Sequence, residues 1–175
     1  IDLQDTIEGC RALIEWGLAD AAKLIIKGGS AGGYTVLNAL VRHPGFFKAG
    51  LCSYGVSNLF LLEMDTHKFE SHYTKQLVGF LPEAAKKFHD WSPIFHAERI
   101  RDAVAVFQGS EDKVVPQEQS EAMVRALQNN RVPHVYRLYE GEGHGFRKKI
   151  HLIDLYETID SFLKQHVIFS FQEEA

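Results

Sequence analysis

The amino-acid sequence predicts an α/β fold in which helices cover both faces of a parallel sheet. Four short apolar segments alternate with helical segments along the chain. These segments are apolar throughout, which is typical of strands buried on both faces, and strands separated by helices build parallel sheets. The 175 residues are 45% hydrophobic, so the chain can bury a sizeable core, and we expect one domain over residues 1–175.

The first half of the chain is predicted to form two helix–strand pairs. Apolar residues recur at helical spacing near the N-terminus, at Ile7, Cys10, Ile14 and Leu18. The second helix is expected to stop at His43-Pro44-Gly45, since glycine and proline end helices. The predicted elements are a helix over about residues 5–19, a strand over 23–27, a helix over 31–42 and a strand over 49–54.

Residues 56–100 differ in composition from the rest of the chain. They are polar and rich in histidine and aromatic residues, with helical pieces such as 73–88 and a break at Trp91-Ser92-Pro93. We interpret them as a cap-like helical insert. The regular alternation then resumes, with a strand over 103–108, a helix over 116–129, a strand over 135–139 and a closing helix over 150–167.

Charge and cysteine content narrow the function classes. Nineteen basic against 23 acidic residues give a net charge of −4, which argues against a nucleic-acid-binding protein. No apolar run approaches the roughly 20 residues of a membrane span, and we expect no signal peptide. Cys10 and Cys52 cannot build a disulfide framework and are expected in the core, so a cytoplasmic protein is predicted. Because the chain starts at Ile1 without Met, we expect a processed product or part of a longer polypeptide.

Three residues suited to nucleophilic catalysis each follow a predicted strand. Ser30 lies in a glycine-rich turn after the first strand, Asp112 follows the third and His144 follows the fourth. Catalytic groups collect at the carboxyl ends of parallel strands. A serine hydroxyl needs a base to take its proton, histidine suits that task, and an aspartate fixes the imidazole tautomer. The order Ser, Asp, His is that of hydrolases with a nucleophile elbow.

The turn around Ser30 also predicts how negative charge is stabilised. Its glycines permit a sharp strand-to-helix turn, and the Ala31 N–H at the start of the helix can bind an oxyanion. Two alternatives stay open from the residues alone. The glycine-rich turn could cradle a phosphate, although it lacks the ending of a P-loop. Asp112 could merely cap a turn, with Glu111 as its nearest rival.

The other histidines and the aromatic residues of the insert are predicted to have mainly structural roles. Histidines 67, 72, 89 and 96 fall in the insert, where one could touch a substrate. Neither H-E-x-x-H nor a pair of C-x-x-C motifs occurs, so we expect no metal site and no cofactor. The aromatic residues of the insert favour a core beneath the cap over a substrate pocket. They are Phe60, Phe69, Tyr73, Phe80, Phe88, Trp91 and Phe95.

Together these residues resemble the catalytic domain of the prolyl oligopeptidase family of serine peptidases, within the α/β-hydrolase superfamily. The matching stretches are Gly28-Gly29-Ser30-Ala31-Gly32-Gly33-Tyr34, Trp91-Ser92-Pro93, residues 108–116 and Gly141-Glu142-Gly143-His144-Gly145-Phe146. Residues 65–71 resemble the bacterial dipeptidyl- or acylaminoacyl-peptidase branch, with His72 where that branch more often has arginine.

The resemblance implies Ser30 as nucleophile, Asp112 as orienting acid, His144 as general base and the Ala31 N–H as an oxyanion donor. It implies hydrolysis of short peptides through an acyl-enzyme. It also implies that the chain holds only the last four of the family domain's eight strands, without the β-propeller and without the loop that supplies a second oxyanion donor. The strand at residues 24–26 would then lie at a sheet edge, so we expect self-association or pairing with a complementary N-terminal polypeptide.

Two other functions remain open from the sequence. A small-substrate carboxylesterase or dienelactone-type hydrolase shares the elbow and the order of the three residues. A catalytically silent fragment could instead bind partners through its exposed sheet edge.

Overall fold

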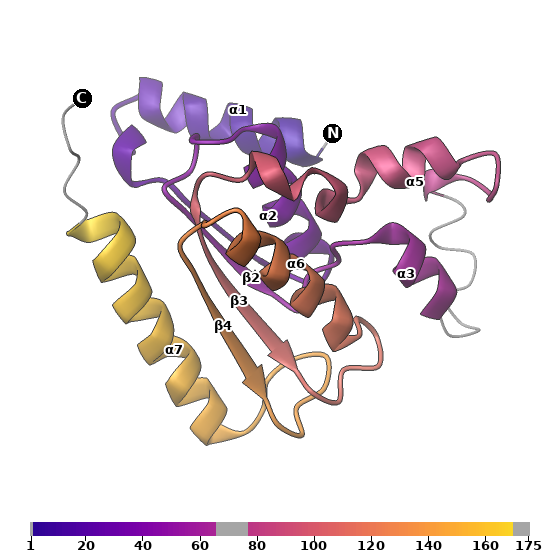
Figure 1. Cartoon of the computed structure of the whole chain (residues 1–175). Coiled ribbons are helices and arrows are strands. Elements are labelled where there is room, and N and C mark those ends of the chain that lie inside the picture. The colour runs from indigo at the N-terminus through magenta and orange to yellow at the C-terminus, as the bar shows by residue number, and fades with distance from the viewer. Residues whose placement is uncertain (1, 66–76, 170–175) are drawn as a thin grey trace.

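Four parallel strands form one sheet in the computed structural model, which describes residues 2–65 and 77–169 (Figure 1). The strands lie in the order β1-β2-β3-β4, so each strand along the chain adds to the same side of the sheet. They are β1 Ile25–Gly29, β2 Ala49–Ser53, β3 Ala103–Gly109 and β4 His134–Tyr139. The predicted α/β class is confirmed, and the carboxyl ends of all four strands meet at one end of the sheet.

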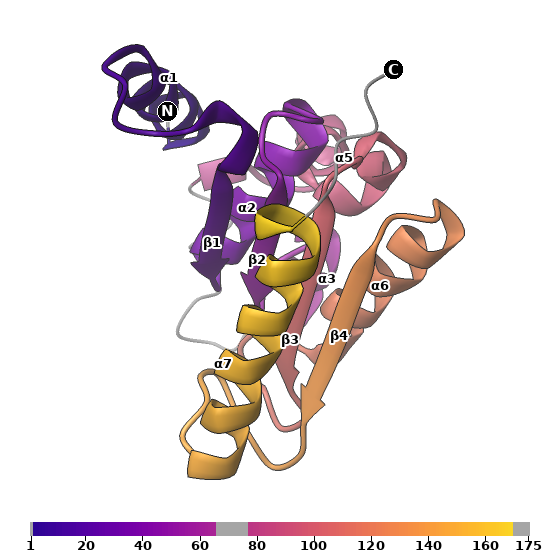
Figure 2. The ribbon, with the colours of Figure 1, turned by 90° about the vertical axis from the view of Figure 1, so that its left-hand side faces the viewer.

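Helices cover both faces of this sheet. The helices are α1 Asp2–Glu15, α2 Ala31–Arg42, α3 Leu59–Asp65, α5 Ala85–Trp91, α6 Gln117–Asn129 and α7 Lys149–Leu163. Two 3-10 helices, η1 Ala21–Lys23 and η2 Pro93–Arg99, and a π-helical turn, η3 Lys164–Ile168, accompany them. Figure 2 shows α7 in front of the sheet, with α2 behind it.

The core is divided between the two faces because successive strand residues point to opposite sides. Val104 and Val106 of β3 pack in the same cluster as residues of α1, α2 and α6. Ala105 and Phe107 pack against α7 on the other face. All seven residues of β3 are buried, as expected for a central strand. Each large apolar side chain buried in this way stabilises the fold by roughly 1.5–3 kcal/mol.

The first helix ends earlier than the sequence predicts. The pattern predicts a helix to about residue 19, but α1 ends at Glu15. Gly17 follows with φ +69°, a left-handed conformation that glycine adopts easily and that stops an α-helix. Leu18, which continues the helical spacing, lies outside the helix and is 72% exposed. Its apolar character therefore does not report a core position.

The helical piece predicted over residues 73–88 is wrong for its middle. Residues 73–76 lie outside the described residues, and residues 79–84 form no helix. Gly79 has φ +117°, and Pro82 lacks the N–H that a helix interior requires. A regular helix begins only at Ala85. The segment at 66–71, including His67 and Phe69, and the residues His72 and Tyr73 also lie outside the described residues.

The cap-like nature of residues 56–100 stays a prediction, but their attachment is visible. The described parts carry α3, α5 and η2, which lie to one side of the sheet (Figure 1). The Tyr34 hydroxyl donates to the Trp91 carbonyl at 2.7 Å. The buried Gln119 side chain accepts hydrogen bonds from the backbone N–H groups of Ser57 and Asn58. Helices α2 and α6 thus hold both ends of this stretch.

The two outer strands of the sheet differ from the central ones. Among the described residues, β1 pairs only with β2, and β4 only with β3. Ile25 and Lys27 of β1 are exposed while Ile26 between them is buried, so one face of the first strand is less covered than the other. None of the helices in the described part of the chain is both long and apolar enough to cross a membrane.

Candidate active site

Three loops meet at the carboxyl ends of the strands, and each carries one of the residues predicted to form the site. Ser30 follows β1, Asp112 follows β3 and His144 follows β4. The His144 Nε2 atom lies 2.9 Å from the Ser30 hydroxyl oxygen. Its Nδ1 atom lies 2.9 Å from the Asp112 Oδ2 atom. The structure therefore brings together the three residues, although 114 positions separate Ser30 from His144 along the chain.

Ser30 stands on a strained turn between β1 and α2. Its φ of +56° and ψ of −121° are rare for a residue with a side chain. The turn is fixed because the Ser30 N–H donates to the Ser53 carbonyl at 3.0 Å. A β-carbon on Gly28 would lie 2.4 Å from the Gly32 carbonyl oxygen, so the motif needs glycine there. Strain held by surrounding contacts is frequent at nucleophile elbows.

Asp112 is oriented by the backbone that follows it. Its side chain is fully buried, and its Oδ1 atom accepts hydrogen bonds from the Val114 and Val115 N–H groups, both at 2.9 Å. Oδ2 faces His144 and also accepts a longer hydrogen bond from the Gln108 side-chain amide, at 3.4 Å. An ionised Asp112 would accept a hydrogen bond from the Nδ1–H group, which leaves Nε2 as the acceptor facing the Ser30 hydroxyl. Glu111, the rival considered from the sequence, is exposed.

Ala31 is the first residue of α2 and lies beside Ser30. Backbone N–H groups in the first turn of a helix have no partner within the helix, and the helix dipole makes this end positive. A negatively charged oxygen close to Ser30 would meet this end of the helix. Ala31 itself is exposed.

A buried glutamine that sequence reasoning missed supports the Asp112 loop. The Gln108 side chain is fully buried and donates to the Val115 carbonyl at 3.0 Å. Its oxygen accepts from the Ser120 hydroxyl at 2.7 Å. Gln108 therefore ties both ends of the Asp112 turn to α6. The available signal was a polar residue at the end of a strand that is otherwise apolar, Ala103 to Phe107.

The loop that carries His144 is held by a buried carboxylate, also missed. Glu142 is 3% exposed and accepts hydrogen bonds from the N–H groups of Arg147 and Lys148, at 3.0 and 2.7 Å. The His151 ring on α7 lies 3.0 Å from the same carboxylate. Burial acts to raise the pKa of Glu142, but these hydrogen bonds outweigh it and lower the pKa below its usual range. The carboxylate thus stays ionised and closes the loop.

The two loops are also joined to each other. The Glu111 N–H donates to the Glu142 carbonyl at 2.9 Å. The Gly141 N–H donates to the Ser110 hydroxyl oxygen, also at 2.9 Å. A β-carbon on Gly109 would lie 2.4 Å from the Glu142 carbonyl oxygen. Because glycine has no β-carbon at this position, the Asp112 and His144 loops can approach closely enough for a hydrogen bond.

Tyr54 directly follows β2 and packs its ring beside His144 in the candidate site. Its ring lies 4.8 Å from the His144 ring and 5.3 Å from the Phe146 ring, between ring centroids. Its backbone φ is +39°, and its N–H donates to the Phe107 carbonyl at 2.7 Å. Aromatic packing of this kind fixes the plane of the imidazole. No sequence motif marked this residue.

The cysteines and the aromatic residues considered from the sequence lie outside the hydrogen-bonded path of Ser30, His144 and Asp112. Cys52 is buried below the Ser30 turn, and burial raises the pKa of its thiol to about 12, so the thiol is inert near neutral pH. Cys10 is partly buried against the core. Phe88 is fully buried, as the core interpretation predicts, whereas Phe80, Trp91 and Phe95 are exposed.

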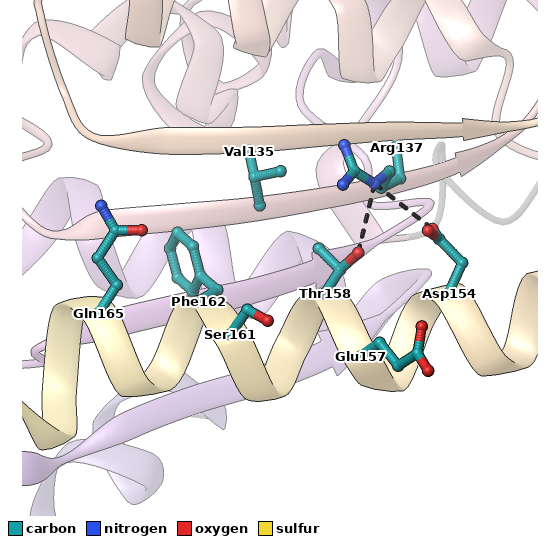
Figure 3. Close-up of a pocket in the computed structure, with 8 residues that line it drawn as sticks. All are labelled: Val135, Arg137, Asp154, Glu157, Thr158, Ser161, Phe162 and Gln165. Carbon is teal, nitrogen blue, oxygen red and sulfur yellow. Dashed lines mark hydrogen bonds and ion pairs between the residues drawn. The ribbon is translucent and has the colours of Figure 1, made fainter.

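A separate hollow of about 300 Å³ lies between β4 and α7 (Figure 3). Arg137 Nε reaches the Thr158 hydroxyl at 3.3 Å and the Asp154 carboxylate at 3.4 Å there. The hollow runs along the flank of the sheet rather than at the strand ends, and it contains none of Ser30, Asp112 and His144.

Comparison with known proteins finds a matching family and several relatives. The sequence profile described as the prolyl oligopeptidase family matches residues 1–168. The chain is 30% identical over 167 residues to dipeptidyl peptidase family member 6 of Caenorhabditis elegans, covering 92% of this chain and 23% of that protein. It is 31% identical over 149 residues to dipeptidyl aminopeptidase BIII of Pseudoxanthomonas mexicana, covering 82% of this chain and 22% of that protein.

Solved structures agree with these relatives. A puromycin-hydrolysing peptidase of Mycobacterium tuberculosis superposes with a TM-score of 0.93 at 39% identity, covering 97% of this chain and 26% of that chain. An acylaminoacyl peptidase of Pyrococcus horikoshii gives a TM-score of 0.88 at 22% identity, covering 99% and 29%, and shares the fold. The chain thus spans about a quarter of the length of the proteins it matches.

Proposed function

Because the chain belongs to the prolyl oligopeptidase family, we propose that it carries the catalytic centre of a serine peptidase acting on short peptides. One observation carries the proposal, namely the continuous hydrogen-bonded path from Ser30 through His144 to Asp112. The glycine-flanked turn at Ser30 and the buried Asp112 support it.

In the proposed reaction, the Ser30 oxygen attacks the carbonyl carbon of the scissile peptide bond. His144 takes the hydroxyl proton at Nε2, and Asp112 stabilises the imidazolium through Nδ1–H. The Ala31 N–H, aided by the dipole of α2, stabilises the negative oxygen of the tetrahedral intermediate. His144 then gives its proton to the leaving amine, which leaves an acyl-enzyme on Ser30. A water molecule, activated by His144 in the same way, releases the acid.

The extent of catalysis depends on the number of oxyanion donors. Removal of one such donor in a serine hydrolase costs about 10²–10³ in turnover. The family resemblance assigns a second donor to a loop upstream of the strand before Ser30. We therefore expect this chain by itself to acylate more slowly than a chain that also contains that loop.

Substrate type is tested by comparing two sets of chromogenic compounds. The proposal predicts cleavage of aminoacyl- or acylaminoacyl-arylamides by the purified chain, and loss of that cleavage in Ser30→Ala. Turnover of short acyl esters with no measurable amide cleavage would instead indicate the carboxylesterase or dienelactone-type alternative. Identical rates for the chain and the Ser30→Ala variant would overturn the assignment of the nucleophile.

We also propose that the outer edge of β1 is covered, by a complementary polypeptide or by a second copy of the chain. The unpaired side of an edge strand offers free N–H and C=O groups for pairing. Trp16 and Leu18, which precede β1, are 69% and 72% exposed, and Ile25 within it is 41% exposed. A constant mass in light scattering across protein concentrations, with no binding of the upstream polypeptide, would contradict this proposal.

A further inference from the structure

A cluster of three potential metal ligands lies outside the candidate active site. His89 and Asp90 lie in the last turn of α5, and His96 lies in η2. One ligand atom from each of the three lies within 4.8 Å of the other two. No other group of three or more histidine, cysteine or acidic side chains with this spacing occurs among residues 2–65 and 77–169.

Buried hydrogen bonds fix the turn that brings His96 back to His89. Ser92 is fully buried, and its hydroxyl donates to the Phe88 carbonyl at 2.7 Å. The same oxygen accepts the Leu59 N–H at 2.9 Å. The Ser92 N–H in turn donates to the His89 carbonyl at 3.1 Å. The backbone positions of the ligands are therefore set by the fold before any ion binds.

The side chains are partly oriented as well. The His89 ring stacks on the Phe95 ring, with centroids 4.6 Å apart and 11° between planes. The His96 ring meets the His89 ring edge-on at 5.5 Å. His89 Nδ1 lies 3.4 Å from the Asp90 carboxylate.

We propose that His89, Asp90 and His96 form a binding site for a zinc-class divalent transition ion. Two imidazole nitrogens and one carboxylate oxygen suit Zn²⁺, whereas Mg²⁺ and Ca²⁺ prefer oxygen ligands alone. Three protein ligands leave one tetrahedral position for water. The site is of a kind that linear motifs do not reveal, because its ligands come from two helices joined by a turn.

The ion would link α5 to η2. The η2 residues Ile94 and Ala97 pack in the core cluster that contains α2, and the Arg42 side chain of α2 donates to the Asp90 carbonyl at 3.3 Å. A metal cross-link here therefore stabilises the packing of residues 85–99 against α2, the helix that follows Ser30. It takes no part in the chemistry at Ser30.

Lys86 provides a specific internal competitor. Its ammonium forms an ion pair with the Asp90 carboxylate, and metal binding must displace or share that contact. Replacement of Lys86 by methionine keeps the length of the side chain while removing the charge. The affinity for Zn²⁺ should therefore rise in Lys86→Met, a result that general attraction of Zn²⁺ to surface histidines would not produce.

The test is isothermal titration calorimetry of the purified chain with Zn²⁺ after treatment with a chelator and dialysis. We expect one ion per chain and a loss of affinity of roughly tenfold or more in His89→Ala/His96→Ala. His134→Ala/His166→Ala is the matched control, since those two histidines lie on β4 and η3. The control should bind as the parent does, and Lys86→Met should bind more tightly.

Circular dichroism of each variant checks that the fold is retained, which the exposure of His89 favours. Asp90→Asn, which preserves shape, provides a second removal of a ligand and should also weaken binding. The proposal is overturned if the parent takes up no Zn²⁺ at micromolar concentrations. It is equally overturned if His89→Ala/His96→Ala retains the parent affinity, or if the control pair loses as much.

Discussion

The carboxyl end of the sheet and the outer edge of β1 belong to one sheet. They differ in how fully their polar groups are hydrogen-bonded within the chain and in how far their apolar side chains are buried. At the carboxyl end, Asp112, Glu142 and Gln108 are buried, and each makes several hydrogen bonds within the chain. Along β1, no strand pairs on the outer side among the described residues, and Ile25 is exposed.

This difference separates the part of the molecule that positions the candidate catalytic residues from the part that favours association. The loops that carry Asp112 and His144 are bonded to α6, to α7 and to each other, so their geometry does not rely on contacts at β1. The side of the molecule formed by α1 and β1 leaves large apolar side chains in water, which favours association. We expect changes at the strand ends to alter chemistry, and changes at the edge to alter assembly.

The largest effect is expected from Asp112→Asn. The amide leaves the shape of the site unchanged but favours the wrong imidazole tautomer, so turnover should fall by about 10⁴-fold. The rate of arylamide hydrolysis measures the loss, with Asp154→Asn on α7 as a matched control outside the site. A variant that retains more than a tenth of the parent rate would show that Asp112 does not orient His144.

A smaller effect is expected from Gln108→Leu, which removes the bonds to Val115 and Ser120 and the longer bond to Asp112 Oδ2. Leaving their partners unsatisfied should lower the free energy of unfolding by about 1–3 kcal/mol. Displacement of the Asp112 loop should also slow the reaction, by between about 10- and 100-fold. Denaturant unfolding and reaction rates with a small serine-directed probe measure the two effects.

Gln119→Leu is the matched control for this change. Gln119 is equally buried and also makes several hydrogen bonds, but to Ser57 and Asn58 rather than to the Asp112 loop. It should lose comparable stability while retaining the rate of reaction with the probe. Equal slowing in the two variants would mean that the loss of stability, and not the position of Asp112, controls the rate.

Glu142 gives a prediction about pH. Because its pKa is lowered in the folded chain, its contribution to stability is complete above the unfolded pKa of about 4.3 and is lost as the pH falls through the folded value. Glu142→Gln should lower the thermal midpoint at pH 7 and flatten its fall below about pH 4.3. Thermal scans of both proteins across that window measure this. Parallel curves would contradict the role given to Glu142.

The smallest effect on chemistry is expected from Leu18→Lys/Ile25→Lys. Both side chains are exposed, Leu18 before β1 and Ile25 within it, and neither takes part in the Ser30–His144–Asp112 hydrogen bonds. The rate of reaction of Ser30 should be unchanged, while concentration-dependent association in light scattering should decrease because the added charges disfavour pairing. A slower reaction of Ser30 with unaltered association would contradict the expectation that the edge controls assembly and the strand ends control chemistry.

Local patterns were sufficient to predict the parts of the molecule that depend on local chemistry. The helix over residues 31–42 lies where the sequence predicts it, because a glycine-rich turn precedes it and His43-Pro44-Gly45 follows it. The strands at residues 103 and 134 agree within one residue. Ser30, Asp112 and His144 could be selected because each follows a strand, and parallel strands share one carboxyl end.

The missed features depend on contacts that form only once the chain has folded. Gln108 acts through Val115 and Ser120, and Tyr54 through a ring 90 positions further along the chain, so no spacing rule reports them. The overextended first helix shows the reverse case, because Leu18 fits the helical period but Gly17 ends the helix before it. The cluster of His89, Asp90 and His96 likewise appears only after the turn at Ser92 is formed.

Covalent labelling of the purified chain with a fluorophosphonate probe tests the central claim most directly, since the probe reacts only with an activated serine. We predict that the chain is labelled, that peptide mapping places the label on Ser30, and that Ser30→Ala abolishes it. Failure of the folded chain to react, or equal labelling of the chain and the Ser30→Ala variant, would contradict the claim that these loops assemble a working nucleophile.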